Sequence, residues 1–134
     1  MSDIVIATAN ARYSHCALGL RCLRANLGDL RQSCSIIEFV LEDWPESMAE
    51  RILAELPRVL GLGVSIWNVE IMGRLTELLK AIRPELPIVL GGPELIDPED
   101  LPDWTTQADF IVSGEGEQVF AELCRTLLEG KQRA

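Results

Sequence analysis

Clustered cysteines are missing from this chain, and with them the sites that need closely spaced thiolates. Four cysteines are scattered along 134 residues. None forms the Cys-x-x-Cys pair typical of zinc and redox sites, and no group of them could hold an iron–sulfur cluster. We therefore expect reduced cysteines that pack as small apolar residues, with Cys16 as the exception because it falls in a loop after an expected strand.

Long apolar runs and an excess of basic residues are also missing. No apolar run is long enough to cross a bilayer, and the N-terminus lacks the basic-then-apolar layout of a secretion signal. We therefore expect a cytoplasmic protein without a membrane partner. Lys and Arg number 12 against 21 Asp and Glu, a formal net charge of −9. This balance argues against a nucleic-acid partner, because binding the phosphate backbone needs clustered basic side chains.

The chain alternates between short apolar runs and segments of helical period. Its length fits one domain, which we assign to residues 1–130, with residues 131–134 as a linker or chain end. The apolar runs predict strands at residues 3–8, 33–41, 59–64, 87–90 and 109–112. A looser stretch rich in Pro and Asp, residues 96–103, precedes the last strand.

Apolar residues spaced three and four apart predict helices between these strands. The first helix carries Leu20, Leu23, Leu27 and Leu30, and the second carries Ala49, Ile52, Leu53 and Leu56. The third helix carries Val69, Met72, Leu75, Leu79 and Ile82 on one apolar face, and the last helix has Val119, Phe120, Leu123, Cys124 and Leu127 inward. We expect Asn68 to cap the third helix and Gly130 to end the last.

This order of elements predicts an α/β fold with a doubly wound, five-stranded parallel sheet of the flavodoxin-like (Rossmann-like) type. Right-handed crossovers favour the strand order 2-1-3-4-5. In such a sheet ligands bind beyond the carboxyl ends of the strands, where the strand order reverses. The unusual residues of this chain follow the expected strands, and we therefore expect its site at that edge.

Two common sites of this fold are excluded by the residues at the strand ends. A dinucleotide site needs Gly-x-Gly-x-x-Gly after the first strand, where the first glycine here is Gly19. A phosphorelay receiver needs acids after the first strand and a lysine after the fifth, where this chain has residues 8–10 (Thr-Ala-Asn) and residues 113–114 (Ser-Gly). A flavin (FMN) site stays open, because Thr8, Asn10 and Ser14 could hold its phosphate and Trp67 could stack on its ring.

Four segments at the strand ends carry a family resemblance. They are Asn-x-Arg-Tyr-Ser-His-x-x-Leu-Gly at residues 10–19, Ser-Ile-Trp-Asn at 65–68, Gly-Gly-Pro-Glu at 91–94 and Gly-Glu-Gly-Glu at 114–117. In this order, they resemble the N-terminal cobalamin-binding domain of cobalamin-dependent radical-SAM proteins, over residues 3 to 130. The resemblance implies cofactor contacts at Asn10, Arg12, Tyr13, Ser14, His15, Leu18, Gly19, Ser65, Ile66, Trp67, Asn68, Gly91, Gly92, Pro93, Glu94, Gly114, Glu115, Gly116 and Glu117.

The resemblance also implies how these positions act. Ser65 and the pair Gly91 and Gly92 would hold the nucleotide tail of cobalamin, because glycine lets a bulky ligand approach the backbone. Gly114 and Gly116 would do the same after the fifth strand. The loop of residues 10–19 would lie under the corrin ring.

Several of these residues have simpler alternative roles. The better-known cobalamin domains carry Asp-x-His-x-x-Gly, whose histidine ligates cobalt. Here Tyr13 replaces the Asp that would orient the imidazole, which favours a loop hydrogen bond or a capping contact for His15 over cobalt ligation. We assign no metal ligand.

Other site residues keep open alternatives as well. Arg12 can pair with an acid such as Glu94 or Glu115, and Tyr13 can close its loop. Trp67 can plug the sheet end. Glu115 and Glu117 fall in the first turn of a helix, where carboxylates are favoured in any case. The Gly91-Gly92 pair can also be a tight turn.

The function implied by the resemblance is to present cobalamin to a radical-SAM barrel located C-terminal to this domain in a longer enzyme. Such a barrel binds S-adenosylmethionine and a four-iron cluster through Cys-x-x-x-Cys-x-x-Cys, a motif this chain lacks. We therefore expect no catalytic residue here, and the reaction stays open between methyl transfer and other radical chemistry. The alternatives are a docking domain of the same fold without cofactor, or an FMN-binding domain.

Overall fold

The structure is a computed structural model that describes residues 2–10, 18–92, 95, 101–112 and 116–133. Its strands are β1 (Ile4–Asn10), β2 (Cys34–Val40), β3 (Val59–Gly63), β4 (Ile88–Gly91) and β5 (Phe110–Val112). The α-helices are α1 (Leu18–Ala25), α2 (Pro45–Leu53), α3 (Val69–Ile82) and α4 (Glu117–Arg133). Two short 3-10 helices, η1 (Gly28–Ser33) and η4 (Asp103–Gln107), complete the described elements.

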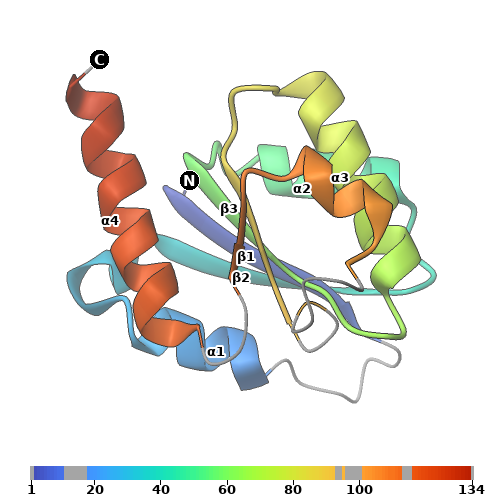
Figure 1. Ribbon diagram of the computed structural model, residues 1–134, viewed down its shortest axis with the longest axis horizontal. Helices are drawn as coiled ribbons and strands as arrows, with labels where there is room; N and C mark the ends of the chain where they lie inside the picture. Colours follow the sequence, from blue (N-terminus) through green and yellow to red (C-terminus); the bar gives the residue numbers. More distant parts are fainter. Residues whose placement is uncertain (1, 11–17, 93–94, 96–100, 113–115, 134) are drawn as a thin grey trace.

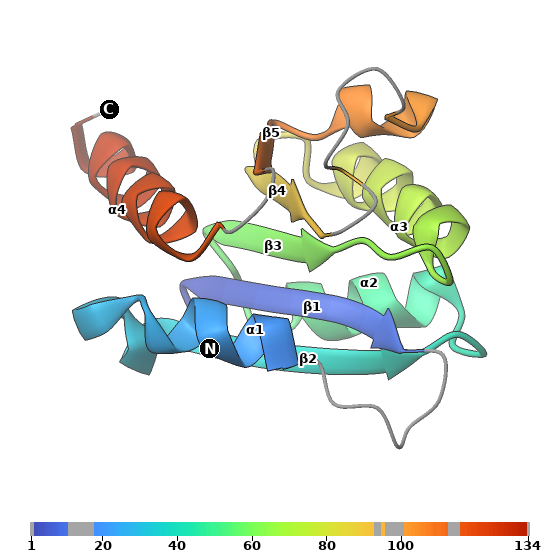
Figure 2. The same cartoon turned by 60° about the horizontal axis from the view of Figure 1, so that its bottom comes forward.

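The five strands form one parallel sheet with the order β2-β1-β3-β4-β5. Figure 2 shows the strands side by side in this order. The predicted fold class and strand order are therefore confirmed. The order reverses between β1 and β3, because the chain moves outward to β2 first and then returns to the other side of β1.

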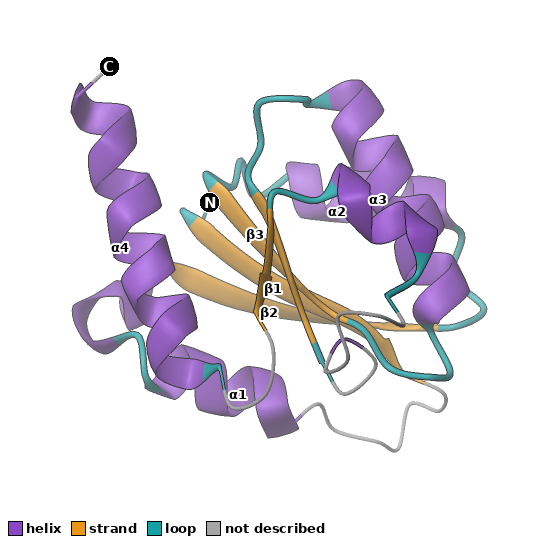
Figure 3. Cartoon of the chain, viewed as in Figure 1, coloured by secondary structure: helices purple, strands orange, loops and turns teal. Residues whose placement is uncertain are grey.

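Helices cover both faces of the sheet, with α1 and α4 on one face and α2 and α3 on the other (Figures 1 and 3). Each face has its own apolar core. Leu20, Leu27 and Phe120 belong to the core under α1 and α4, and Met48, Met72 and Leu79 to the core under α2 and α3. A strand covered on both faces is apolar throughout, and all seven residues of β1 are buried.

The connection from β4 to β5 contains η4, which packs on α3. A close approach to Gly73 makes this packing possible, because a Cβ at Gly73 would lie 2.8 Å from the indole ring of Trp104. The looser stretch of residues 96–103 is described from residue 101 on, and its last residue, Asp103, begins η4.

The expected helices differ from the observed ones at their ends. Leu56 was expected on the second helix, but α2 ends at Leu53. Leu56 stands directly before Pro57, and the residue before a proline disfavours the helical conformation. It has φ 54° and is exposed. Ile82 and Val119 were expected on buried faces, yet both are exposed at a helix end. The prediction that Gly130 ends the last helix is wrong, because α4 continues to Arg133. Among the described residues, no helix has the length and apolarity that crossing a bilayer requires.

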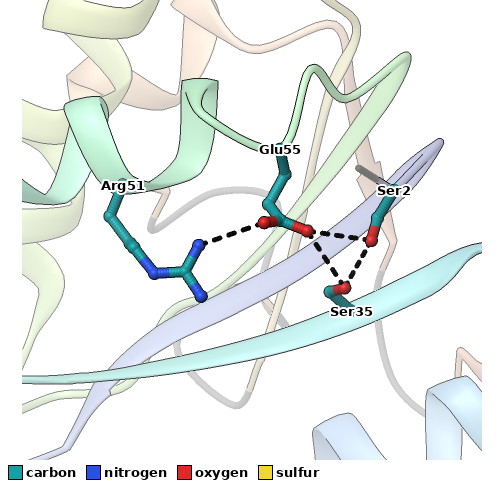
Figure 4. A network of polar contacts seen from close by, with 4 residues as sticks. All are labelled: Ser2, Ser35, Arg51 and Glu55. Carbon is teal, nitrogen blue, oxygen red and sulfur yellow. Dashed lines mark hydrogen bonds and ion pairs between the residues drawn. The ribbon is translucent and has the colours of Figure 1, made fainter.

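A polar cluster closes the amino edge of the sheet (Figure 4). The Ser2 and Ser35 hydroxyls donate to Glu55 Oε1 at 3.0 and 3.3 Å and are hydrogen-bonded to each other. Arg51 Nη1 donates to Glu55 Oε2 at 3.3 Å. The hydrogen bond from Ser2 is the main cause that lowers the pKa of the Glu55 carboxyl. This cluster lies at the edge opposite to the expected site and fastens the start of the chain to β2 and the end of α2.

Candidate functional site

A pocket of about 340 Å³ opens at the carboxyl edge of the sheet, on the face covered by α1 and α4. This volume lies in the range of small-molecule sites, which is about 300–1,000 Å³. Its lining comes from the ends of β1, β3 and β4, the loop after β3, and the facing sides of α1 and α4. The lining residues are Ile6, Thr8, Asn10, Leu20, Leu23, Gly61, Leu62, Gly63, Val64, Ser65, Trp67, Val89, Leu90, Gly91, Gly92, Val112, Gly116, Glu117 and Phe120.

Part of the pocket floor is backbone, because three of the strand residues that face it are glycines. Alternate residues of a strand point to the same side, so Gly61 and Gly63 of β3 face α1 and α4 while their neighbours Leu60 and Leu62 are buried in the other core. Gly63 pairs with Gly91 of β4, which extends this bare surface to the next strand. A glycine inside a strand often marks a place where a ligand comes close to the backbone.

The walls of the pocket are apolar. Leu20 and Leu23 of α1 stand on one side and Phe120 of α4 on the other. Phe120 is 3% exposed, and a Cβ at Gly61 would lie 3.1 Å from two carbons of its ring. The ring therefore closes the deep end of the pocket, and a flat apolar group entering over Gly63 would meet it there.

Hydroxyl groups line the mouth of the pocket. Thr8 lies two residues before the end of β1 and donates from Oγ1 to the carbonyl oxygen of Gly63 at 2.8 Å. Ser65 follows β3, and its side-chain hydroxyl has no hydrogen-bond partner within the part of the chain that the structure describes. Its backbone N–H is held instead, by Asn68 Oδ1 at 2.7 Å. The free hydroxyl at this point is available to a polar group of a ligand.

Trp67 and Ile66 project from the loop between β3 and α3. Trp67 is 53% exposed and lines the mouth of the pocket, whereas Ile66 is 71% exposed and does not line it. Trp67 thus stands at the rim and does not fill the end of the sheet as a buried plug. An exposed indole beside an apolar pocket offers a flat surface to a ring system.

Gly91, the last residue of β4, and Gly92, which follows it, differ in whether the fold requires glycine. Gly92 has φ +131°, and a Cβ there would lie 2.0 Å from the carbonyl oxygen of Val64. This position needs glycine for the fold itself, as the tight-turn alternative expected. Gly91 has no such constraint, since the nearest atom to its Cβ would be the Val112 carbonyl oxygen at 3.7 Å. A side chain at Gly91 would extend into open pocket space.

Seven of the predicted site residues come together around this pocket: Asn10, Ser65, Trp67, Gly91, Gly92, Gly116 and Glu117. Ile66 and Asn68 are described and do not line it. Leu18 and Gly19 are the first residues of α1. The remaining predicted positions lie outside the described residues: Arg12, Tyr13, Ser14, His15, Pro93, Glu94, Gly114 and Glu115.

Asn68 occupies the N-cap position of α3, as predicted, but its side chain makes no capping hydrogen bond. It is 1% exposed and turned toward the sheet. The carboxamide Nδ2 donates to Thr8 Oγ1 at 3.0 Å and to the carbonyl oxygen of Ala9 at 2.9 Å. The amide is therefore engaged inside the protein and is not available to a ligand.

The residues that shape the pocket were not predicted as site residues. They are Gly61 and Gly63 in the floor, and Leu20, Leu23 and Phe120 in the walls. The hydrogen bond from Thr8 on β1 to Gly63 on β3 was not predicted either. The signal was present in the Gly-Leu-Gly of β3, because glycines at alternate positions leave one face of a strand without side chains.

The cysteines and acids form no metal site in the described parts of the chain, where no group of three or more His, Cys, Asp or Glu side chains comes together. Burial raises the pKa of Cys34 to about 11 and that of Cys124 to about 12. Both thiols are buried in the core under α1 and α4, as expected, whereas Cys22 is exposed. None of the three lines the pocket.

Residues 4–124 match the family model of the B12 binding domain. The match spans most of the chain, and the protein therefore belongs to the B12-binding domain family. The solved structure of a cobalamin-binding protein from Desulfitobacterium hafniense DCB-2 has a TM-score of 0.66 and 16% sequence identity, over 94% of this chain and 58% of that one. At this identity the likeness concerns the fold.

Two curated relatives are more similar in sequence over part of the chain. The cobalamin-dependent radical SAM methyltransferase TokK of Streptomyces tokunonensis is 33% identical over 84 residues, which is 62% of this chain and 12% of the relative. The 2-(S-pantetheinyl)-carbapenam-3-carboxylate methyltransferase of Streptantibioticus cattleyicolor is 37% identical over 68 residues, 50% of this chain and 10% of the relative. The matched region is thus about a tenth of each relative's length.

Proposed function

We propose that the pocket at the carboxyl edge binds cobalamin by its nucleotide tail. The observation that supports this most directly is the glycine floor at Gly63 and Gly91, which ends where the Phe120 ring covers Gly61, in a chain of the B12-binding domain family. A flat aromatic base would lie over Gly63 and Gly91 with its edge toward the Phe120 ring. Ser65 offers a hydroxyl at the mouth for the polar part of the tail.

The pocket is too small for a corrin ring with its side chains, so the ring belongs outside it, over the carboxyl edge. Trp67 stands at that rim with half of its surface exposed. Asn10 at the end of β1, Glu117 at the start of α4 and Gly116 just before it line the same edge. When bound, cobalamin supplies a cobalt centre that can carry a methyl group, and the residues of this chain hold and orient the cofactor.

The domain would serve as the cofactor module of a longer enzyme. Both curated relatives are methyltransferases by name, one of them a radical SAM enzyme, and both are far longer than the matched region. We therefore extend the proposal to presentation of cobalamin to a radical-SAM barrel, with its four-iron cluster and S-adenosylmethionine, in a cytoplasmic methyltransferase. The described residues contain no metal cluster of their own, and this proposal assigns the cluster to the barrel.

A titration of the purified domain with hydroxocobalamin, followed by desalting and UV–visible spectroscopy, tests the proposal. We expect retained cobalamin absorbance in the native domain and its loss in Gly91→Val, whose added methyl groups extend into the pocket. Ala81→Val, on an exposed position of α3 away from the pocket, is the matched control and should bind as the native domain does. Equal binding by all three proteins would contradict the assignment of this pocket, and yellow protein with FMN absorbance would favour the flavin alternative.

A further inference from the structure

The two strands that flank the reversal of strand order separate at their carboxyl ends. The ladder between β1 and β3 ends at the pair Ala7 and Leu62. Beyond it, β1 continues to Asn10 paired with β2 alone. On the other side of the gap, Gly63 pairs with Gly91 of β4. The crevice in which this fold binds ligands begins at this point.

The side chain of Asn68 fills the start of that gap. Its Nδ2 donates to Thr8 Oγ1 and the Ala9 carbonyl oxygen on β1, and to the Gly63 carbonyl oxygen on β3 at 3.3 Å. Its Oδ1 accepts the backbone N–H of Ser65 at 2.7 Å. The carboxamide therefore continues the ladder, in the place where a peptide group would have joined the two strands.

This arrangement requires a neutral group with donors on one side and an acceptor on the other. The atoms that receive the Nδ2 hydrogens are oxygens, and the atom that meets Oδ1 is a backbone nitrogen. An aspartate of the same shape keeps the acceptor and loses the donors, which leaves a charge facing carbonyl oxygens. A buried polar network of this kind fixes one geometry only while each member is satisfied.

We infer that Asn68 is a positioning residue for the cofactor site. Without touching the pocket, it is bonded to two lining residues, Thr8 and Ser65, and the loop it holds carries a third, Trp67. It sets the separation of β1 and β3 at the mouth and fixes the loop that presents the Ser65 hydroxyl and the Trp67 ring. The part of this inference that concerns the cofactor rests on the function proposed above.

The test compares Asn68→Asp and Asn68→Ala with Leu79→Ala, a destabilising control on the same helix. Leu79 is fully buried against the opposite face of the sheet and has no contact with the pocket. Each protein is titrated with hydroxocobalamin well below its own Tm, and hydrogen exchange of the backbone amides of residues 65–67 is measured without ligand. Mutation of the residues that orient metal ligands typically changes affinity by about 10–100-fold, and we take this range as the guide for a side chain that orients pocket residues.

We expect the Kd of both Asn68 variants to rise by about tenfold or more, and exchange at residues 65–67 to become faster. Leu79→Ala should lose stability while keeping the native Kd and the native exchange at this loop. Asn68 variants that bind like Leu79→Ala, with unchanged loop exchange, would overturn the inference. If the native domain binds no hydroxocobalamin, the proposed function fails, and the exchange measurement alone decides: faster exchange supports the positioning of the loop, and unchanged exchange overturns it.

Discussion

Gly61 on β3 lies directly beneath the ring of Phe120 on α4, so close that a Cβ would be 3.1 Å from two ring carbons. This contact joins the last helix to the centre of the sheet and sets the depth of the pocket. Backbone on one side and an aromatic ring on the other leave no room for even a methyl group without movement. Stability and pocket shape therefore depend on the same pair of residues.

Replacing Gly61 by alanine should destabilise the domain by about 1–3 kcal/mol, because overpacking forces the Phe120 ring to shift. Urea unfolding measures this difference. In a Phe120→Leu background the same substitution should cost less than half as much, since the smaller side chain leaves the added methyl group room. Equal costs in the two backgrounds would show that the two residues are not coupled, contrary to the contact described here.

An added side chain should lower the stability of the domain strongly at Gly92 and hardly at all at Gly91. We expect Gly92→Ala to lose on the order of 3 kcal/mol, because its φ is positive and its Cβ would collide with the Val64 carbonyl oxygen. Gly91→Ala should change stability by no more than about 0.5 kcal/mol. Urea unfolding of the two variants checks this contrast, and similar losses at both positions would contradict it. Only Gly91 is therefore suitable for blocking the pocket in a folded protein.

Much of the fold was predictable because its physical causes lie in local sequence patterns. Buried parallel strands are short apolar runs, and the apolar stripe of α3 recurs at spacings of three and four from Met72 to Leu79. This spacing of apolar residues does not show which part of a helix face the neighbouring elements cover. Ile82 ends α3, and Val119 lies in the first turn of α4 next to the buried Phe120; both were expected on apolar faces and both are exposed.

The location of the site could be predicted better than the residues that form it. The residues after the strands gather at one edge because parallel strands end together, which brought Ser65, Trp67 and Gly91 to one pocket. The direction of each side chain depends on tertiary contacts. Asn68 has the residue type of a helix cap, yet its carboxamide makes better-matched hydrogen bonds to the ends of β1 and β3. Gly61 was not among the predicted site residues, and the structure places it in the pocket lining beneath the Phe120 ring.

The stability of the domain should depend on pH through Glu55. The pKa of this carboxyl is lowered in the folded state, chiefly by the Ser2 hydrogen bond. Its ionised form therefore stabilises the fold above the unfolded-state pKa of about 4.3, and this contribution is lost as the pH falls through the folded-state pKa. Glu55→Gln should thus be less stable than the native domain at neutral pH, with a difference that shrinks in acid.

Urea unfolding at a series of pH values from neutral to acid measures the Glu55 effect. Glu50→Gln, which removes an exposed carboxylate from α2, is the control for the change in net charge. A stability difference between native and Glu55→Gln that stays constant over this range, or that Glu50→Gln reproduces, would argue against a role for the amino-edge cluster of Ser2, Ser35, Arg51 and Glu55.

Thiol labelling should separate the described cysteines by burial. The thiolate is the reactive form, and burial raises the pKa of Cys34 to about 11 and that of Cys124 to about 12, so both stay protonated and shielded at neutral pH. Cys22 is exposed on α1. Iodoacetamide at neutral pH should therefore modify Cys22 in the native domain and reach Cys34 and Cys124 only in denaturant, as followed for each site by peptide mass. Rapid labelling of Cys124 in the native state would mean that α4 detaches from the sheet, and with it the Phe120 wall of the pocket, far more often than its buried contacts imply.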